Sequence, residues 1–170
     1  MEINNKVKWL TFTALFMSMN IVLSSFSIPV PGGHLYLNDI VICTASIILD
    51  PLAAFLVGGV GAFLGDMIFY PAPMFVSLVT HGVQAAVISL CVNKLFKNRE
   101  EMGAVIGVTL GVIIMVTGYT LGRAFVYSTI QAAIIKLPFE FLQGLLGAVS
   151  SVLLCYRVNL KKRFAQIAMG

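Results

Sequence analysis

Apolar residues fill six stretches of this chain, and glycine, proline or charged residues bound each one. An α-helix needs about 20 predominantly apolar residues to cross the hydrocarbon core of a bilayer, and Gly, Pro and charge mark helix ends. The sequence therefore predicts six transmembrane helices in a single domain over residues 1–170. Their expected limits are about residues 9–26, 38–49, 51–70, 74–96, 103–125 and 137–156. The predicted fold class is an all-α polytopic membrane protein.

Three segments need separate treatment. The stretch 38–49 is too short to cross a flat bilayer upright, so either the preceding loop lends it residues or neighbouring helices bury it. Two prolines and two glycines in residues 27–37 predict a loop there. Asp50 and Pro51 are typical of an N-cap followed by the first helical position. The mildly polar segment 126–136 is predicted to lie at the membrane interface.

Composition supports the membrane assignment and excludes several classes of protein. Hydrophobic residues make up 59% of the chain and charged residues 11%, against about 45–50% and about 25% in soluble domains. The three cysteines lie in apolar stretches without metal-binding spacing, so they are predicted to be core residues. The sequence contains no nucleotide-binding loop, no nucleophile elbow and no H-E-x-x-H motif. Neither a metal nor a cofactor is expected.

The basic residues predict the orientation in the membrane. With six spans and both termini in the cytoplasm, every Lys and Arg except Arg123 and Lys136 falls on the cytoplasmic side. Basic residues in short loops favour that side. The first apolar stretch is long for a secretory signal peptide, so it is predicted to be the first span.

Polar side chains inside the apolar stretches gather toward the predicted outer ends of the helices. At 1.5 Å per residue, His81 lies about 10 Å below the outer end of its helix. Polar groups in hydrocarbon are costly and are commonly functional, and their convergence from several helices predicts a binding pocket open to the outside. The candidate binding residues are Tyr36, Asn38, His81, Gln84, Tyr119, Arg123, Glu140 and Gln143.

Structural roles for the same residues stay open at this point. Arg123 could form an ion pair with Glu140 or Asp66 that locks adjacent helices. Asn38 or Asp39 could cap a helix. His81 could donate a hydrogen bond between helices.

Several short motifs resemble those of a known family. The chain is similar to the substrate-binding S components of energy-coupling factor (ECF) vitamin transporters, and more specifically to their riboflavin-transporter-like branch. The motifs that carry this resemblance are L-N-D-I at 37–40, L-D-P at 49–51, L-V-G-G-V-G at 56–61, L-G-D at 64–66, Pro73 and T-H-G-V-Q at 80–84.

The resemblance implies a binding and transport module, not an enzyme, in the plasma membrane of a prokaryote. Such a protein captures a B-type vitamin or precursor from outside, and the loop Ser27–Leu37 acts as a lid over the pocket. It docks on a transmembrane coupling subunit carried by two ATPases. Docking in the family commonly uses Ala-x-x-x-Ala on the first helices. This chain has Ala14 and Ser18 at that spacing, which keeps the residues small but changes one of them.

The candidate pocket suits a small, polar, heteroaromatic ligand. His81 and Gln84 would exchange hydrogen bonds with ring heteroatoms or hydroxyls, and Tyr36 and Tyr119 would stack on a flat ring. We expect a pyridoxine-like or hydroxymethylpyrimidine-like ligand, with riboflavin as the alternative. A self-powered, proton-coupled carrier that uses acidic and imidazole groups of the pocket is a second hypothesis, and an intramembrane acid–base enzyme is a third.

Overall fold

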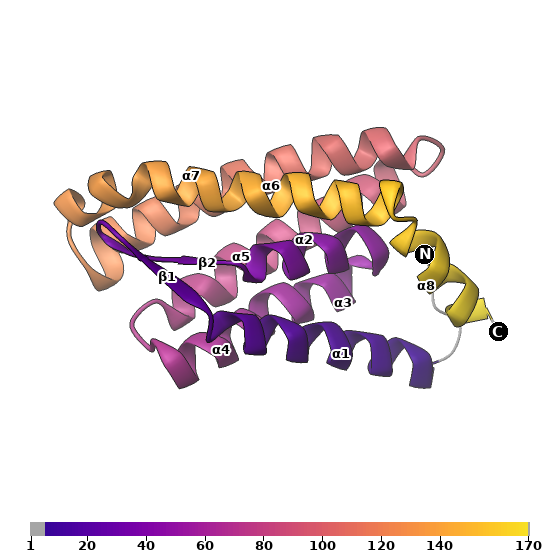
Figure 1. The fold of residues 1–170 in the computed structure, drawn as a ribbon, viewed down its shortest axis with the longest axis horizontal. Helices are drawn as coiled ribbons and strands as arrows, with labels where there is room; N and C mark the ends of the chain where they lie inside the picture. The colour runs from indigo at the N-terminus through magenta and orange to yellow at the C-terminus, as the bar shows by residue number, and fades with distance from the viewer. Residues whose placement is uncertain (1–5, 170) are drawn as a thin grey trace.

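The computed structural model describes residues 6–169 as an elongated, mostly helical bundle with one β-hairpin (Figure 1). Helices α1 (Lys6–Ser24) and α2 (Asn38–Ile48) flank the hairpin in sequence. Most of the later helices continue through a five-residue stretch of π-helix (η) and remain continuous. The remaining elements are α3 (Pro51–Phe55), η1 (Leu56–Val60), α4 (Gly61–Phe69), α5 (Met74–Leu90), η2 (Cys91–Leu95), α6 (Glu100–Gly122), η3 (Arg123–Tyr127), α7 (Ile130–Val152), η4 (Leu153–Arg157) and α8 (Leu160–Met169).

Within the described residues, 5 helical segments are long and apolar enough to cross a membrane. They are Lys6–Ser24, Pro51–Phe69, Met74–Leu95, Glu100–Tyr127 and Ile130–Arg157. The chain is thus a multi-pass membrane protein. The shorter apolar helix α2 is buried at every position except Ile40 and packs among α1, α5 and α7. Burial by neighbouring helices, one of the two expected solutions for this short segment, shields it from lipid.

The structure differs most from the predicted helix limits at the start of α7. The helix expected from residue 137 begins at Ile130, because the side chain of Thr129 caps it by accepting a hydrogen bond from the Ala132 amide at 3.2 Å. Segment 126–136 is therefore helical on both sides of a short turn, and Lys136 lies inside a helix. The preceding helix begins at Glu100, where acidic side chains suit the positive end of the helix dipole.

The loop expected between the first two helices is a two-stranded antiparallel hairpin, so the all-α prediction was wrong in this segment. Strand β1 (Ser27–Val30) pairs with β2 (Gly33–Tyr36), with Ser27 opposite Tyr36 and Val30 opposite Gly33. The tight turn between them depends on Gly32, whose φ of 81° disfavours side chains with a Cβ. Helix α8 was also not predicted; it follows Asn159, which adopts a left-handed φ of 60°.

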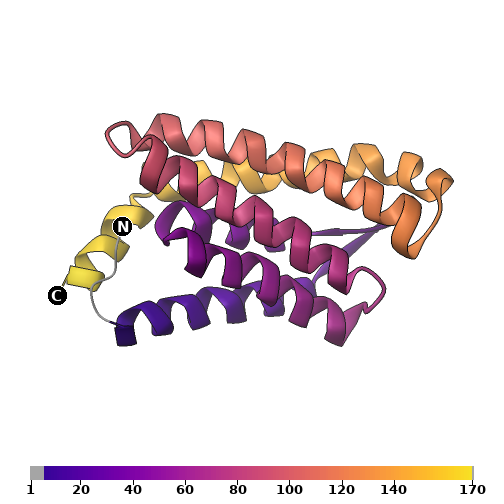
Figure 2. The ribbon, with the colours of Figure 1, turned by 180° about the vertical axis from the view of Figure 1, so that it is seen from behind.

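The described elements place two groups of connections at opposite ends of the bundle. Helix α8, the start of α1 and the α5–α6 connection lie at one end, whereas the hairpin turn and the α4–α5 and α6–α7 connections lie at the other (Figures 1 and 2). Near the first end, the predicted N-cap is confirmed: the Asp50 carboxylate accepts hydrogen bonds from the Leu52 and Ala53 amides at 3.1 and 3.2 Å. The indole N–H of Trp9 also donates to this carboxylate.

Candidate functional site

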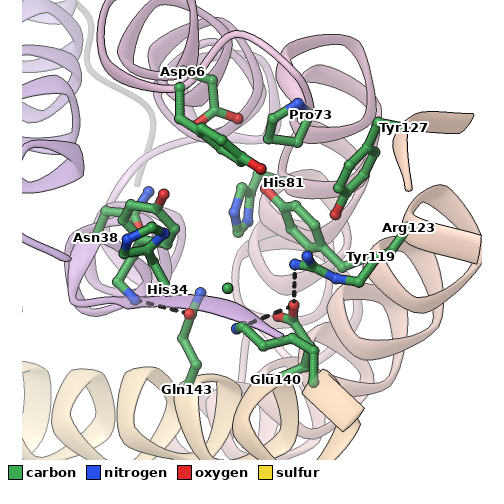
Figure 3. A pocket seen from close by; sticks show the side chains of 14 residues that line it. His34, Asn38, Asp66, Pro73, His81, Tyr119, Arg123, Tyr127, Glu140 and Gln143 are labelled. Atoms are coloured by element: carbon green, nitrogen blue, oxygen red, sulfur yellow. Dashed lines mark hydrogen bonds and ion pairs between the residues drawn. The ribbon is translucent and has the colours of Figure 1, made fainter. Parts of the chain in front are cut away.

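A polar pocket lies beneath the hairpin, at the end of the bundle away from α8 (Figure 3). The space between its lining atoms, counted together with the solvent at its open side, is about 460 Å³. Side chains from the hairpin and from α2, α4, α5, α6, η3 and α7 converge on it. The lining residues are Gly33, His34, Tyr36, Asn38, Asp66, Tyr70, Pro73, His81, Tyr119, Arg123, Tyr127, Lys136, Glu140 and Gln143.

The residues expected from the sequence to bind a ligand all line this pocket except Gln84. Gln84 is fully buried one layer deeper, where it contacts His81 and Asp39. The two residues expected to dock a partner, Ala14 and Ser18, lie on the exposed side of α1, and the Ser18 hydroxyl donates to the Ala14 carbonyl at 2.8 Å.

Two cations share one carboxylate on the α7 side of the pocket. Oε1 of Glu140 lies 3.1 Å from Nη2 of Arg123 and 3.2 Å from Nζ of Lys136. All three side chains are almost completely buried, so their charges depend on one another rather than on water. The ion pair between Arg123 and Glu140 that the sequence left open is thus present, and it is part of the pocket wall.

The same wall holds the hairpin in place. Nη1 of Arg123 donates to the Gly32 carbonyl at 2.9 Å, and the Tyr36 amide donates to Oε1 of Gln143 at 2.9 Å. A Cβ on Gly32 would lie 3.1 Å from Cβ of Lys136, so glycine lets the turn rest directly on α7. The hairpin therefore covers the pocket through contacts with residues that also line it.

Asp39 organises the floor of the pocket. Its two oxygens accept from the amide groups of Gln84 at 3.2 Å and of Gln143 at 2.6 Å. Gly147 permits this arrangement, because a Cβ there would lie 2.7 Å from Cβ of Asp39. Neither Asn38 nor Asp39 caps helix α2, since Leu37 occupies the N-cap position without a side-chain hydrogen bond. The capping alternative for these residues was wrong.

The Asp39 network sets the tautomer that a neutral His81 adopts. A carboxylate only accepts hydrogen bonds, so the Gln84 amide nitrogen faces Asp39 and its oxygen faces Nδ1 of His81 at 2.7 Å. Nδ1 must then carry the proton. The neutral imidazole consequently presents Nε2 as a hydrogen-bond acceptor.

A second carboxylate lies on the α4 side. The Ser77 hydroxyl donates to Asp66, and the hydroxyls of Ser77 and Tyr119 lie 2.6 Å apart. Because Ser77 uses its single proton on Asp66, Tyr119 must donate to Ser77. This chain of hydroxyls fixes the Tyr119 ring beside His81, with their ring centres 5.2 Å apart.

Aromatic side chains form the rim beneath the hairpin. His34 lies 6.2 Å from the ring of Tyr70 and 6.3 Å from the ring of Tyr36. Burial, assisted by the charge of Asp66, raises the pKa of Tyr36 to about 12. Its phenol therefore stays protonated at neutral pH and can both donate a hydrogen bond and stack on a ring.

Three buried polar atoms of lining residues have no hydrogen-bond partner among the described residues: Asn38 Oδ1, Arg123 Nε and Tyr127 Oη. Buried polar groups in native proteins nearly always find a partner. Among the lining residues, one acceptor, one donor and one hydroxyl therefore have no hydrogen-bond partner.

Lys136 and Asp39 are the main lining or supporting residues that the sequence reasoning missed. Lys136 was expected outside the helices, in segment 126–136 on the outer side, although its spacing of four residues from Glu140 is that of an ion pair on one helix face. Asp39 was noted among the outer polar residues and as a possible cap, but it was not among the candidate binding residues. Its position next to Asn38 at the start of a short apolar stretch was the available signal.

Comparison with known proteins identifies the family of this chain. Residues 4–162 match the family of ECF-type riboflavin transporter S components. An uncharacterised protein of Pyrococcus woesei is 32% identical over 145 residues, covering 82% of this chain and 92% of the relative. The thiamine precursor transporter HmpT of Lactococcus lactis subsp. cremoris (strain MG1363) is 30% identical over 151 residues, covering 86% and 84%.

The fold is also similar to that of a solved S component of a bacterial ECF transporter. The TM-score is 0.72 at 19% identity, over 91% of this chain and 97% of that one. A structural match at this identity supports the fold alone, whereas the family match spans nearly the whole sequence. The chain belongs to the ECF-type riboflavin transporter S component family, a family of membrane transport components for vitamin uptake.

Proposed function

We propose that this protein captures a small nitrogen heterocycle of the vitamin or vitamin-precursor class from outside the cell for ATP-driven uptake. The observation that carries the proposal is a buried pocket whose lining residues include unpartnered polar atoms of both hydrogen-bonding types, on Asn38, Arg123 and Tyr127. Energy would come from a membrane coupling subunit and two ATPases, as the family implies. The exposed small residues Ala14 and Ser18 on α1 would meet the coupling subunit.

A hydroxymethylpyrimidine-like or pyridoxine-like ligand is favoured. Such molecules combine a flat ring with hydroxyl and basic nitrogen groups. These match the aromatic rim of Tyr36 and Tyr70, the acceptor Nε2 of His81 and the donors of Arg123 and Lys136. The relative named as a thiamine precursor transporter supports the same class.

Riboflavin is the alternative, because the matching family model carries its name. Four charged side chains line the pocket, Asp66, Arg123, Lys136 and Glu140. The uncharged, larger isoalloxazine ring would desolvate these groups without providing them with charged partners, which is costly.

The direction of capture follows from the proposed topology. We place six crossings in the plasma membrane of a prokaryote, with α2 as the short one and both termini in the cytoplasm. The basic residues near the start of α1, in the α5–α6 connection and in α8 then face the cytoplasm. The pocket opens on the opposite face.

The test begins with the small molecule that co-purifies with the full chain in detergent, identified by mass spectrometry. Titrations of the stripped protein with hydroxymethylpyrimidine, pyridoxine and riboflavin then rank the ligands. We expect one of the first two to bind most tightly, and preference for riboflavin would contradict the ligand class. Uptake into liposomes by the chain alone, driven by a pH gradient and indifferent to ATP, would contradict the dependence on coupling subunits.

A further inference from the structure

We infer that Asp66 is a specificity-determining subsite of the pocket, which accepts the N–H donors of a basic nitrogen heterocycle while Arg123 and Lys136 face its acceptor end. The inference rests on the proposed function, because it assigns a chemical feature to the ligand captured there. Figure 3 shows Asp66 on one side of the pocket and Glu140 with Arg123 on the other.

The three carboxylates at the pocket are balanced in different ways. Glu140 has two cationic partners within 3.2 Å, and Asp39 has both oxygens occupied by side-chain amides. Asp66 forms no ion pair with any Lys or Arg in residues 6–169, and it receives only the hydroxyl of Ser77. This carboxyl group of the pocket wall therefore has no Lys or Arg counter-ion within the described residues.

The position of this carboxylate is fixed before a ligand arrives. Ser77 donates to Oδ2 of Asp66 and is itself held by the Tyr119 hydroxyl. Ser77 is fully buried on α5, so this side of the carboxylate cannot turn to water. Oδ1 has no partner among the described residues and remains for a ligand. A preorganised acceptor in a low-dielectric site gains most from a polarised or charged donor.

The pocket thus has Asp66 on one side and the cations Arg123 and Lys136 on the other. This distribution of charge favours some ring systems over others. An aminopyrimidine places an exocyclic amine beside a ring nitrogen, and after protonation both can donate to one carboxylate, in the manner of an amidinium. The imide N–H of an isoalloxazine lies between two carbonyl oxygens, which a carboxylate would repel. Asp66 consequently favours basic heterocycles and disfavours flavins. This preference for basic heterocycles is a separate argument for the proposed ligand class, which the unpartnered atoms of Asn38 and Arg123 do not provide.

A purely structural role for Asp66, as the acceptor that holds Ser77 and Tyr119, predicts a different result. Loss of that support would shift the Tyr119 ring and lower the affinity for every ligand by a similar factor. A specificity role requires that the effect of a substitution depends on the group that the ligand presents. The two roles can therefore be separated by pairing a protein variant with a ligand variant.

The experiment measures equilibrium binding of two probes by isothermal titration calorimetry to the full chain in detergent. The probes are 4-amino-5-hydroxymethyl-2-methylpyrimidine and its analogue in which a ring carbonyl replaces the 4-amino group. Asp66→Asn keeps the shape of the side chain and can still accept from Ser77. We expect this substitution to lower the affinity for the amino compound at least about tenfold. The affinity for the carbonyl analogue should change by less than about threefold or increase. Asp66→Glu, which keeps the charge, should retain a preference for the amino compound.

Two outcomes overturn the inference in distinguishable ways. If wild-type protein binds the amino compound but Asp66→Asn weakens both probes equally or neither, the proposed function stands and the Asp66 subsite is rejected. If wild-type protein binds riboflavin and neither pyrimidine, the proposed ligand class is rejected together with the subsite. Thermal unfolding of each variant without ligand shows whether a loss of affinity reflects a loss of fold.

Discussion

Glu140 should be essential to the stability of the empty protein as well as to ligand capture. The substitution Glu140→Gln keeps the size of the side chain and removes only its charge. Lys136 is 1% exposed and Arg123 is 9% exposed, so neither cation of the shared cluster can recover its hydration without opening the hairpin.

The size of the effect follows from the two distances. At 3.1 and 3.2 Å, an effective dielectric constant of about 20 gives a gross attraction of about 5 kcal/mol for each pair. Desolvation offsets most of this, but removal of one partner from a buried pair typically costs about 3–5 kcal/mol, because the remaining charge is left unpaired. Lys136→Met should cost less than about 1 kcal/mol, since Glu140 keeps Arg123 and the methionine is apolar.

Thermal unfolding in detergent without ligand tests these expectations. For a chain of this length, about 3–5 kcal/mol corresponds to a decrease in the unfolding midpoint on the order of 10 °C. The double variant Glu140→Gln with Lys136→Met should be more stable than Glu140→Gln alone, because it leaves one unpaired cation instead of two. A Glu140→Gln midpoint within about 2 °C of wild type, or a double variant that loses the sum of the single effects, would refute the idea of a mutually dependent charge cluster.

Three further expectations concern binding, packing and topology. His81→Ala should weaken ligand binding at least about tenfold, or about 1.4 kcal/mol, because Nε2 is the acceptor that its tautomer presents. Cys91→Ala, at a buried site outside the pocket, is the matched control, and equal ligand affinities of the two variants would contradict the role of His81. Gly58→Ala should destabilise the fold by about 1–3 kcal/mol, since the new Cβ would lie 2.6 Å from the His81 carbonyl; an unchanged denaturation midpoint would show that α5 can move aside. A membrane-impermeant thiol reagent applied to intact cells should label Ala72→Cys and miss Asn98→Cys, and the reverse pattern would invert the proposed topology. Both native residues are exposed, whereas the natural cysteines are buried.

Hydrophobic patterning was sufficient for the helical architecture because lipid and core both require apolar faces. It could not locate the start of α7, since a buried Lys136 looks like a loop residue until its partner Glu140 is placed on the same helix face. The sequence did not predict the hairpin for a related reason. Pro29 and two glycines exclude a helix, but strand pairing between Ser27 and Tyr36 is a contact between two segments that local composition does not report.

The position of the polar site was more predictable than the hydrogen-bond partners of its residues. The rise per residue placed His81, Tyr119 and Glu140 at a similar depth, because each lies only a few turns from the predicted outer end of its own helix. Spacing within single helices carries no information about partners on other helices. The pairing of Asp39 with Gln143, and of Asp66 with Ser77, depends on helix rotation and separation, which close contacts at glycines such as Gly147 help to set.

The guanidinium of Arg123 links closure of the hairpin to occupancy of the pocket. Nη1 is committed to the Gly32 carbonyl and Nη2 to Glu140, while Nε has no partner among the described residues. A ligand acceptor can therefore take Nε without displacing either existing contact. The planar fork loses little further freedom when it does so, because the hairpin and α7 already hold it. Capture would then add a third contact to a side chain fixed by two others, so a ligand bound at Nε would stabilise the closed hairpin instead of competing with it.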